Sequence, residues 1–149
     1  MIEREGSAMA RFAIACAIGF ASVFGFVVLP ASATEPDPML ARVGAEMFQQ
    51  YCASCHGTSA DGKGPVAPAL KTLPADLTRI AARRGGEFPD AEISRWIDGR
   101  FDVVAHGTRE MPIWGRKFQE TIGAGTDPDE VVRGRVLTLV EYLKTIQQK

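Results

Sequence analysis

Cys52, Cys55 and His56 combine residue types and a spacing that point to one chemistry. They lie in Cys-Ala-Ser-Cys-His at residues 52–56, so two residues separate the thiols and an imidazole follows directly. Two thiols at this spacing can each form a thioether with a vinyl group of haem, and the adjacent histidine then lies where it can ligate the iron. The motif therefore predicts one covalently attached haem c.

Other uses of this cysteine pair fit the sequence less well. A thioredoxin-like dithiol is expected between a strand and a helix, whereas this motif follows a helical pattern and leads into a loop rich in glycine and proline. A zinc site needs two further ligands of the cysteine or histidine type, and outside the motif residues 34–149 contain only His106. A disulfide between Cys52 and Cys55 would leave His56 without a role.

The opposite axial position of the iron has four candidates, namely Met39, Met47, Met111 and His106. Met39 and Met47 lie on the expected helix that enters the motif. Met111 begins Met-Pro-Ile-Trp-Gly, whose proline and glycine indicate a loop that can present a side chain to the far face of the haem. We therefore favour Met111 over His106, and ligation by methionine and histidine would raise the reduction potential.

The overall composition is that of one folded domain. The chain has 149 residues, of which 46% are hydrophobic and 23% are charged. A net charge of −1 excludes a protein that binds nucleic acid by general electrostatic attraction. Three cysteines are too few for a small disulfide-rich scaffold.

The first 33 residues form a predicted secretory signal peptide. An arginine precedes an uncharged apolar run at residues 12–29, and Pro30 leads into an Ala-Ser-Ala site at residues 31–33. This order is typical of a signal peptide cleaved after that site. Residues 34–149 would then be the mature domain in the periplasm. The alternative is an uncleaved membrane anchor, because the apolar run just reaches the length of a span.

Apolar periodicity and turn residues predict short helices separated by loops, and no segment alternates as a strand would. Asp127 is the predicted N-cap of the last helix, with proline at the first helical position. Glycine and proline predict a long loop after the haem motif. The expected helices are 39–51, 76–84, 89–98, one turn at 116–119, and the last helix from 128 onward.

These features resemble the class I c-type cytochromes, the small monohaem cytochromes c of the bacterial periplasm. In that family a glycine and an aromatic residue on the first helix pack against an aromatic residue on the last helix, and Gly44, Phe48 and Tyr142 match them. The resemblance covers about residues 39–148. It implies an all-α cytochrome c fold, in which the N- and C-terminal helices cross and short helices and loops surround one haem.

The resemblance also implies the residues of the haem site. Pro68 begins Pro-Ala-Leu, which matches a family motif whose proline carbonyl accepts a hydrogen bond from the haem-ligating histidine. The stretch that begins at Met111 matches the family's methionine loop. The residues expected to bind the haem are Cys52, Cys55, His56, Pro68, Met111 and Trp114, with His56 and Met111 as ligands of the iron.

The charged residues near the expected site fit either a functional role or an ordinary role at the surface. Arg83 and Arg84 can pair with a haem propionate or can simply end a helix in solvent. Arg109, Arg116 and Lys117 flank the methionine loop and can form a basic docking surface, although neighbouring glutamates dilute it.

The predicted function is one-electron transfer and not catalysis, because an iron with both axial positions filled cannot bind a substrate. We expect a monomeric carrier that moves electrons between respiratory or dehydrogenase partners through small, transient interfaces. If Met111 does not ligate, the iron is open and the protein is a gas sensor or a peroxidase-like haem protein. A cytochrome subunit of a larger oxidoreductase complex is a further alternative that the sequence does not separate from a free carrier.

Overall fold

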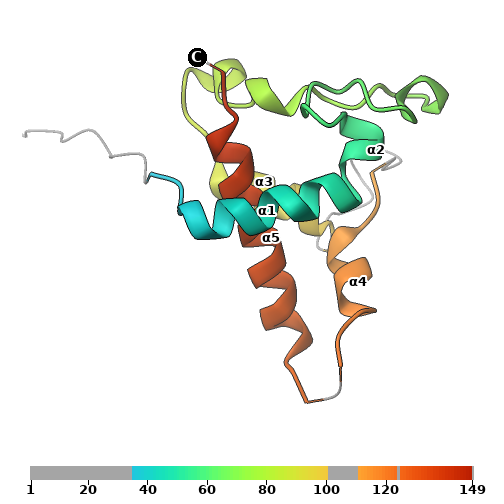
Figure 1. The fold of residues 1–149 in the computed structure, drawn as a ribbon, viewed down its shortest axis with the longest axis vertical. Coiled ribbons are helices and arrows are strands. Elements are labelled where there is room, and N and C mark those ends of the chain that lie inside the picture. Colours follow the sequence, from blue (N-terminus) through green and yellow to red (C-terminus); the bar gives the residue numbers. More distant parts are fainter. Residues whose placement is uncertain (1–34, 101–110, 124, 149) are drawn as a thin grey trace, which may run out of the picture. The chain divides into compact units, whose positions relative to one another are not determined.

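The fold consists of helices joined by loops. A computed structural model describes residues 35–100, 111–123 and 125–148, which belong to one unit of the chain. Within these ranges there is no strand, and the predicted all-α fold is confirmed. The elements in chain order are α1 (Pro38–Tyr51), α2 (Ala53–His56), three 3-10 helices η1 (Ala67–Ala69), η2 (Leu77–Arg79) and η3 (Ala82–Arg84), then α3 (Asp90–Asp98), α4 (Trp114–Gln119) and α5 (Pro128–Thr145) (Figure 1). The predicted signal peptide at residues 1–33 and His106 lie outside the described residues.

The two long helices, α1 and α5, begin in the same way. Asp37 Oδ1 accepts hydrogen bonds from the backbone N–H groups of Met39 and Leu40, each at 2.9 Å. Asp127 Oδ1 accepts one from the N–H of Asp129 at 2.9 Å, which confirms Asp127 as the predicted N-cap. A proline follows each aspartate at the start of the helix, where its missing N–H leaves no gap in the hydrogen bonding. These side chains pair donors that a helix start leaves unpaired.

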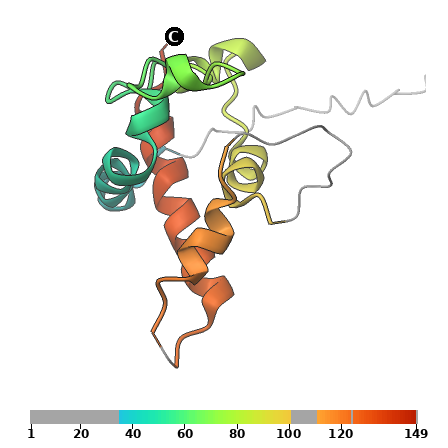
Figure 2. The same cartoon turned by 90° about the vertical axis from the view of Figure 1, so that its right-hand side faces the viewer.

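Helix α1 crosses α5, and Figures 1 and 2 show this crossing from two directions. Gly44 lies at the closest approach, because a Cβ added there would overlap the backbone carbonyl of Thr138 and lie 2.9 Å from Tyr142 Cβ. Beside this contact the rings of Phe48 and Tyr142 pack with their centroids 5.3 Å apart. The predicted packing of Gly44 and Phe48 against Tyr142 is therefore present.

The segment between Asp76 and Arg84 differs from its prediction as one helix. It forms two separate 3-10 turns, η2 and η3. The carboxylate of Asp76 accepts hydrogen bonds from both the backbone N–H (2.9 Å) and the hydroxyl (2.6 Å) of Thr78, which holds the first turn tight. Gly85 then takes the left-handed conformation, at φ 70°, and ends η3. Short 3-10 turns of this kind are common in connections between longer elements.

Helices α3 and α4 lie close to their predicted positions. Helix α3 starts at Asp90 with Pro89 as its N-cap, and Gly99 ends it in the left-handed conformation at φ 66°. Helix α4 begins at Trp114, earlier than the predicted turn at 116–119, and ends at Gln119 as predicted.

The hydrophobic core lies along α5. Helices α1, α3 and α4 all pack against α5, and α3 and α4 also contact each other (Figure 2). The largest fully buried side chains are Phe48, Phe118, Val132, Leu139 and Val140. Among the helices in the described residues, none combines the length and apolar character needed to cross a membrane.

Candidate haem-binding site

The Cys-Ala-Ser-Cys-His motif occupies the single turn of α2, directly after α1. Cys52 links the two helices, and its carbonyl accepts hydrogen bonds from the N–H groups of Cys55 (3.1 Å) and His56 (2.9 Å). Both thiols and the imidazole are half-buried, and neither of these cysteines forms a disulfide. One helical turn therefore presents two thiols and one imidazole together, as covalent attachment of a haem requires.

The loop after the motif folds back onto α2. Backbone N–H groups within residues 62–66 donate to the carbonyls of residues 54–56 at 2.8–3.1 Å. Gly64 lies so close that an added Cβ would overlap backbone atoms of Ser54 and Cys55. The carbonyls that the end of α2 leaves unpaired are thus bound by the loop, which fixes the turn that carries the thiols.

The His56 ring is oriented by a backbone carbonyl, and that carbonyl belongs to Ala75. Nδ1 of His56 lies 3.0 Å from the Ala75 carbonyl oxygen. The expected acceptor was Pro68, but Pro68 lies on η1 with its side chain exposed, in the wall of a shallow apolar hollow that Leu73 also lines. A hydrogen bond at Nδ1 places the proton there and leaves Nε2 as the nitrogen that can ligate iron. Because the acceptor follows the long loop, residue spacing along the chain gave no signal for it.

The chain around Ala75 is itself held in place. The N–H of Leu77 donates to the carbonyl of Ala60 at 2.8 Å, and Arg83 Nη2 donates to the carbonyl of Asp76 at 2.9 Å. Ala60 is fully buried and has a positive φ of 59°, a strained conformation for a residue with a side chain. These contacts fix the acceptor of His56 relative to α2.

The thiol of Cys52 lies in a weakly solvated place. Burial, with a smaller effect of the neighbouring Cys55, raises the pKa of Cys52 to about 12. A buried thiol of this kind stays neutral at physiological pH. An apolar environment suits the thioether that covalent attachment would form there.

Three aromatic rings connect the motif to α4. Tyr51, the residue before Cys52, lies edge-on to Trp114 and to Phe118, with centroid distances of 5.7 Å and 5.6 Å. Trp114 and Phe118 are 5.9 Å apart. Edge-to-face packing of this kind adds attraction beyond the burial of the rings. The start of α4, which follows the Met111 stretch, is thereby joined to the haem motif.

The methionine candidates differ in their surroundings. Met39 is 62% exposed at the start of α1, and Met47 Sδ accepts a hydrogen bond from Thr138 Oγ1 at 3.4 Å. Met111 is half-buried and packs against the core just before α4. His106, the fourth candidate, lies outside the described part of the chain. Ligation by Met111 stays a prediction.

The half-buried apolar side chains at the margin of the core suit a haem. Beyond the thiols and the imidazole, a set of half-buried apolar side chains lies against the core without being enclosed by it. This set comes from η2, α3, the segments that lead into α3 and α4, and α4 itself, namely Leu77, Phe88, Ile93, Met111 and Trp114. An apolar macrocycle matches such a surface, because it covers carbon that the chain leaves partly exposed.

The two arginines that were candidates for a haem propionate have other partners. Arg84 Nη1 and Nη2 donate to the two oxygens of the Glu92 carboxylate at 2.5 Å, and this hydrogen bonding is the main cause that lowers the pKa of Glu92. Arg83 binds the backbone carbonyl already described. Neither contact supports pairing of Arg83 or Arg84 with a haem propionate.

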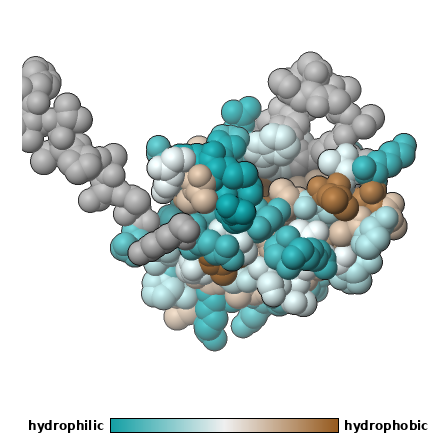
Figure 3. All heavy atoms as spheres, turned by 90° about the horizontal axis from the view of Figure 1, so that it is seen from above, coloured by the Kyte–Doolittle hydropathy of each residue, from teal (hydrophilic) through white to brown (hydrophobic). Residues whose placement is uncertain are grey.

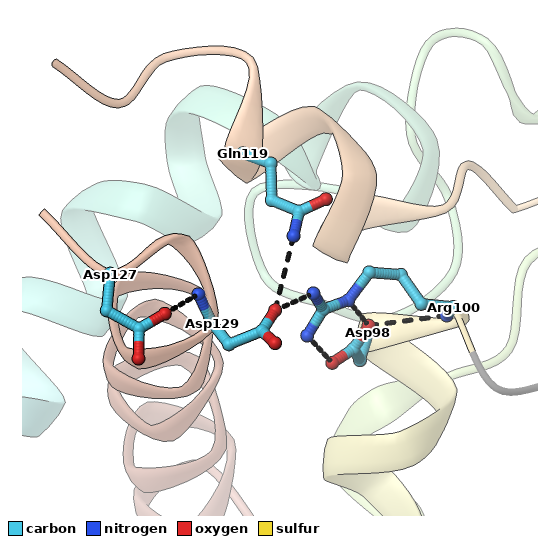
Figure 4. A network of polar contacts seen from close by, with 5 residues as sticks. All are labelled: Asp98, Arg100, Gln119, Asp127 and Asp129. Carbon is cyan, nitrogen blue, oxygen red and sulfur yellow. Dashed lines mark hydrogen bonds and ion pairs between the residues drawn. The ribbon is translucent and has the colours of Figure 1, made fainter. Parts of the chain in front are cut away.

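A cluster that the sequence did not reveal lies at the end of α3 (Figure 4). Arg100 pairs with both carboxylate oxygens of Asp98, at 2.6 Å and 2.9 Å, and with Asp129 at 2.5 Å. The hydrogen bonds to Asp98 chiefly hold the pKa of Arg100 above its ordinary value. The left-handed Gly99 turns the chain so that Arg100 folds back on Asp98. The sequence signal that could have indicated this pair is the aspartate at the end of the α3 pattern followed by Gly-Arg.

Comparison with known families identifies the chain. A family model described as cytochrome c oxidase, cbb3-type, subunit III matches residues 40–122, which is more than half of the chain. The chain belongs to this cytochrome c family. Comparisons with curated proteins and with solved structures return no match.

Membership of the cytochrome c family establishes the cofactor and the general role. The domain is a monohaem class I c-type cytochrome with a covalent haem c, and its field of action is electron transport. Such domains are typically electron carriers and not catalysts, and c-type cytochromes of bacteria are extracytoplasmic. The matched range contains the haem motif, α3 and the Met111 stretch, while α5 lies beyond it.

Proposed function

We propose that this cytochrome is a periplasmic one-electron carrier whose iron is ligated by His56 and Met111. The observation that carries the proposal is that two separate contacts link the haem-motif turn, and the residue before it, to other parts of the chain. His56 Nδ1 is bound by the Ala75 carbonyl, and the α4 start next to Met111 packs through Trp114 onto Tyr51, the neighbour of Cys52. The first contact orients His56, and the second joins the helix that follows Met111 to the same motif, which supports the pairing of these two ligands.

The residues of the chain divide the work of electron transfer. The haem supplies an iron that gains or loses one electron. Cys52 and Cys55 hold it covalently, and the hydrogen bond from His56 to Ala75 keeps the imidazole in one tautomer and one orientation. Met111 would supply the second ligand of the iron, and a thioether in that role would raise the reduction potential. Trp114 and its aromatic neighbours join the start of α4 to the residue before Cys52.

The partners we propose are respiratory or dehydrogenase proteins that dock transiently on the monomeric carrier. Large hydrophobic side chains are exposed near α2, among them Leu73 (72%) and Val66 (41%). Figure 3, which looks down on the loops near α2, shows hydrophobic atoms gathered at one side of a largely hydrophilic face. The basic surface suggested by the sequence is weaker in the structure, since Lys117 pairs with Glu120 at 3.1 Å.

A cytochrome subunit of an oxidase complex is the second candidate, and the description of the matching family favours it. The two readings differ in what accompanies the protein. A subunit would co-purify with the other subunits in mild detergent, whereas a carrier would be recovered alone from the periplasm. The N-terminal residue of the isolated protein, by mass spectrometry, decides whether residues 1–33 are a cleaved signal peptide or an anchor.

The ligation is tested by visible spectra of ferric and ferrous protein, with and without carbon monoxide, for wild type, Met111→Ala and Met39→Ala. We expect the wild type and the exposed control Met39→Ala to show a sulfur-to-iron band and no carbon monoxide binding. Met111→Ala should lose the band and bind carbon monoxide. Carbon monoxide binding by the wild type, or a band that survives in Met111→Ala, would overturn the ligation and favour an open-iron sensor or a peroxidase-like protein.

A further inference from the structure

The Asp98–Arg100–Asp129 cluster joins three helices near the Met111 stretch. Asp98 is the last residue of α3, Asp129 lies in the first turn of α5, and Gln119 at the end of α4 donates to Asp129 Oδ1 at 3.2 Å (Figure 4). Arg100 lies between the two aspartates and donates to both. The guanidinium therefore joins the end of α3 to the start of α5, and Gln119 joins the end of α4 to the same aspartate.

Burial distinguishes this cluster from the other arginine pair on α3. The side chains of Arg100 and Asp98 are only 15% and 12% exposed, whereas those of Arg84 and Glu92 are 41% and 42% exposed. An exposed pair contributes little to a structure. Removing one partner of a buried pair is costly, because the other charge is left without compensation. The Arg100 pair is thus of the kind that fixes geometry.

Helix α4 is seated directly on this pair. Gly115, in the first turn of α4, is buried, and an added Cβ would overlap Asp98 Oδ1 and lie 2.6 Å from Arg100 Nε. On another side, the Trp114 ring packs on Tyr51. The start of α4 is therefore fixed by the Arg100 pair and by the aromatic ring next to the haem motif.

The contact between α4 and the Arg100 pair also restricts the position of Met111. Arg100 precedes and Met111 follows the ten-residue segment 101–110, and Met111 lies just before α4. Arg100 is held by its ion pairs, and Gly115, four residues after Met111, is packed against the same pair. The cluster thereby constrains where the Met111 side chain is presented.

We propose that Arg100 is a positioning residue for Met111, the proposed second ligand of the iron. The ion pairs of Arg100 with Asp98 and Asp129 hold α4, and this keeps Met111 bound to the iron. This inference rests on the proposed ligation by Met111. Bound and detached states of the methionine are in equilibrium, and an external ligand binds only the detached state. Its apparent affinity therefore reports the detached fraction. Loosening the Arg100 pair should enlarge that fraction.

The test is imidazole titration of the ferric protein, followed by the loss of the sulfur-to-iron band. Arg100→Gln should bind imidazole at least about tenfold more tightly than wild type. Arg84→Gln, which breaks the exposed pair with Glu92 on α3, should stay within about twofold of wild type.

Gly115→Ala should act like Arg100→Gln, because it displaces the pair of Arg100 and Asp98 without removing a charge. Arg100→Lys, which keeps the charge but not the two-pronged geometry, provides a milder variant that also should bind more tightly than wild type.

The same variants in a Met111→Ala background separate positioning from a general structural role. There the iron is already open, so Arg100→Gln and Arg84→Gln should bind imidazole equally. An Arg100 effect that persists without Met111, or an Arg100→Lys and a Gly115→Ala that both match wild type, would overturn the inference. A wild-type band that survives in Met111→Ala would instead overturn the ligation itself, so the two failures are distinguishable.

Discussion

At the scale of single residues, the orientation of His56 depends on a backbone group and not on a side chain. Its Nδ1 meets the carbonyl of Ala75 at 3.0 Å. Asp76, the next residue, accepts hydrogen bonds from Thr78 and so starts η2 directly after that carbonyl. The ligand orientation and a small helix cap are therefore parts of one short segment.

Asp76 should make the stability of the fold depend on pH in the acidic range. The hydrogen bond from Thr78 is the main cause that lowers the pKa of Asp76 below its ordinary 3.8. A lowered pKa in the folded state means that the ionised group stabilises the fold at neutral pH, and that this contribution is lost as the pH falls through the folded-state pKa. We expect wild type to be more stable than Asp76→Asn at pH 7, with the gap closing below about pH 4.

Urea unfolding of both proteins across this pH range measures the gap. Glu46→Gln, on the exposed face of α1, is the matched control and should show no comparable closing. A gap between wild type and Asp76→Asn that is constant from neutral to acidic pH would contradict a role for the charge of Asp76.

At the scale of elements, polar contacts as well as the core hold the helices around α5. Glu141 on α5 is buried and accepts a hydrogen bond from the N–H of Asp37, the N-cap of α1, at 2.7 Å. It also pairs with Lys144 at 3.2 Å, and Lys144 reaches Asp90 at the start of α3 at 3.0 Å. Helices α1, α3 and α5 are thus joined by a chain of polar contacts that runs from a backbone N–H through two ion pairs.

Gly44→Ala should weaken the crossing of α1 and α5. Its Cβ would overlap the Thr138 carbonyl, which is backbone and cannot rotate away. Forcing the two helices apart should cost about 1–3 kcal/mol in the free energy of unfolding. Gly134→Ala on α5 is the matched control, since no atom lies within 4 Å of its added Cβ. It should stabilise the protein by up to about 1 kcal/mol, because alanine favours helix.

Denaturant unfolding of the haem-loaded proteins compares the two alanine variants. Equal effects of the two substitutions would mean that helix propensity, and not the close approach of α1 and α5, decides the stability at Gly44.

At the scale of the whole molecule, the haem is expected to complete the interior. The core along α5 is enclosed, but the half-buried side chains of Leu77, Phe88 and Ile93 lie at its margin. A haem attached at Cys52 and Cys55 would cover carbon that these side chains leave partly exposed. Stability of the fold and attachment of the cofactor should therefore be linked.

Cys52→Ala combined with Cys55→Ala should produce a chain without covalent haem that unfolds at a lower temperature and over a broader range than the haem-loaded protein. The cause is the loss of apolar surface that only the macrocycle supplies. Circular dichroism in a thermal scan measures both midpoint and breadth. The wild-type chain produced without haem attachment is the control and should behave like the double variant. A double variant that unfolds with the midpoint of the loaded protein would contradict the expected link.

The sequence by itself determined the features that depend on residues close together in the chain. The haem motif is a matter of spacing within one turn, and the predicted Asp-Pro start of α5 depends on a side chain that binds a backbone group two residues away. Asp37 caps α1 in the same way, although the predicted helix began only at residue 39. The crossing at Gly44 joins distant residues, and the resemblance to the cytochrome family implied it; a glycine inside a helix is not enough, since Gly134 lies within α5 without another element close to it.

Only the tertiary structure decided which distant groups meet. Ala75 reaches His56 because the loop between them folds back over α2, so the carbonyl at His56 Nδ1 is that of Ala75 and not that of Pro68, which was predicted from a motif. Arg100 folds back on Asp98 because Gly99 is left-handed, and Asp129 joins them only when α5 packs against α3 and α4. Such partners depend on the path of the whole chain, and spacing along the sequence does not encode that path locally.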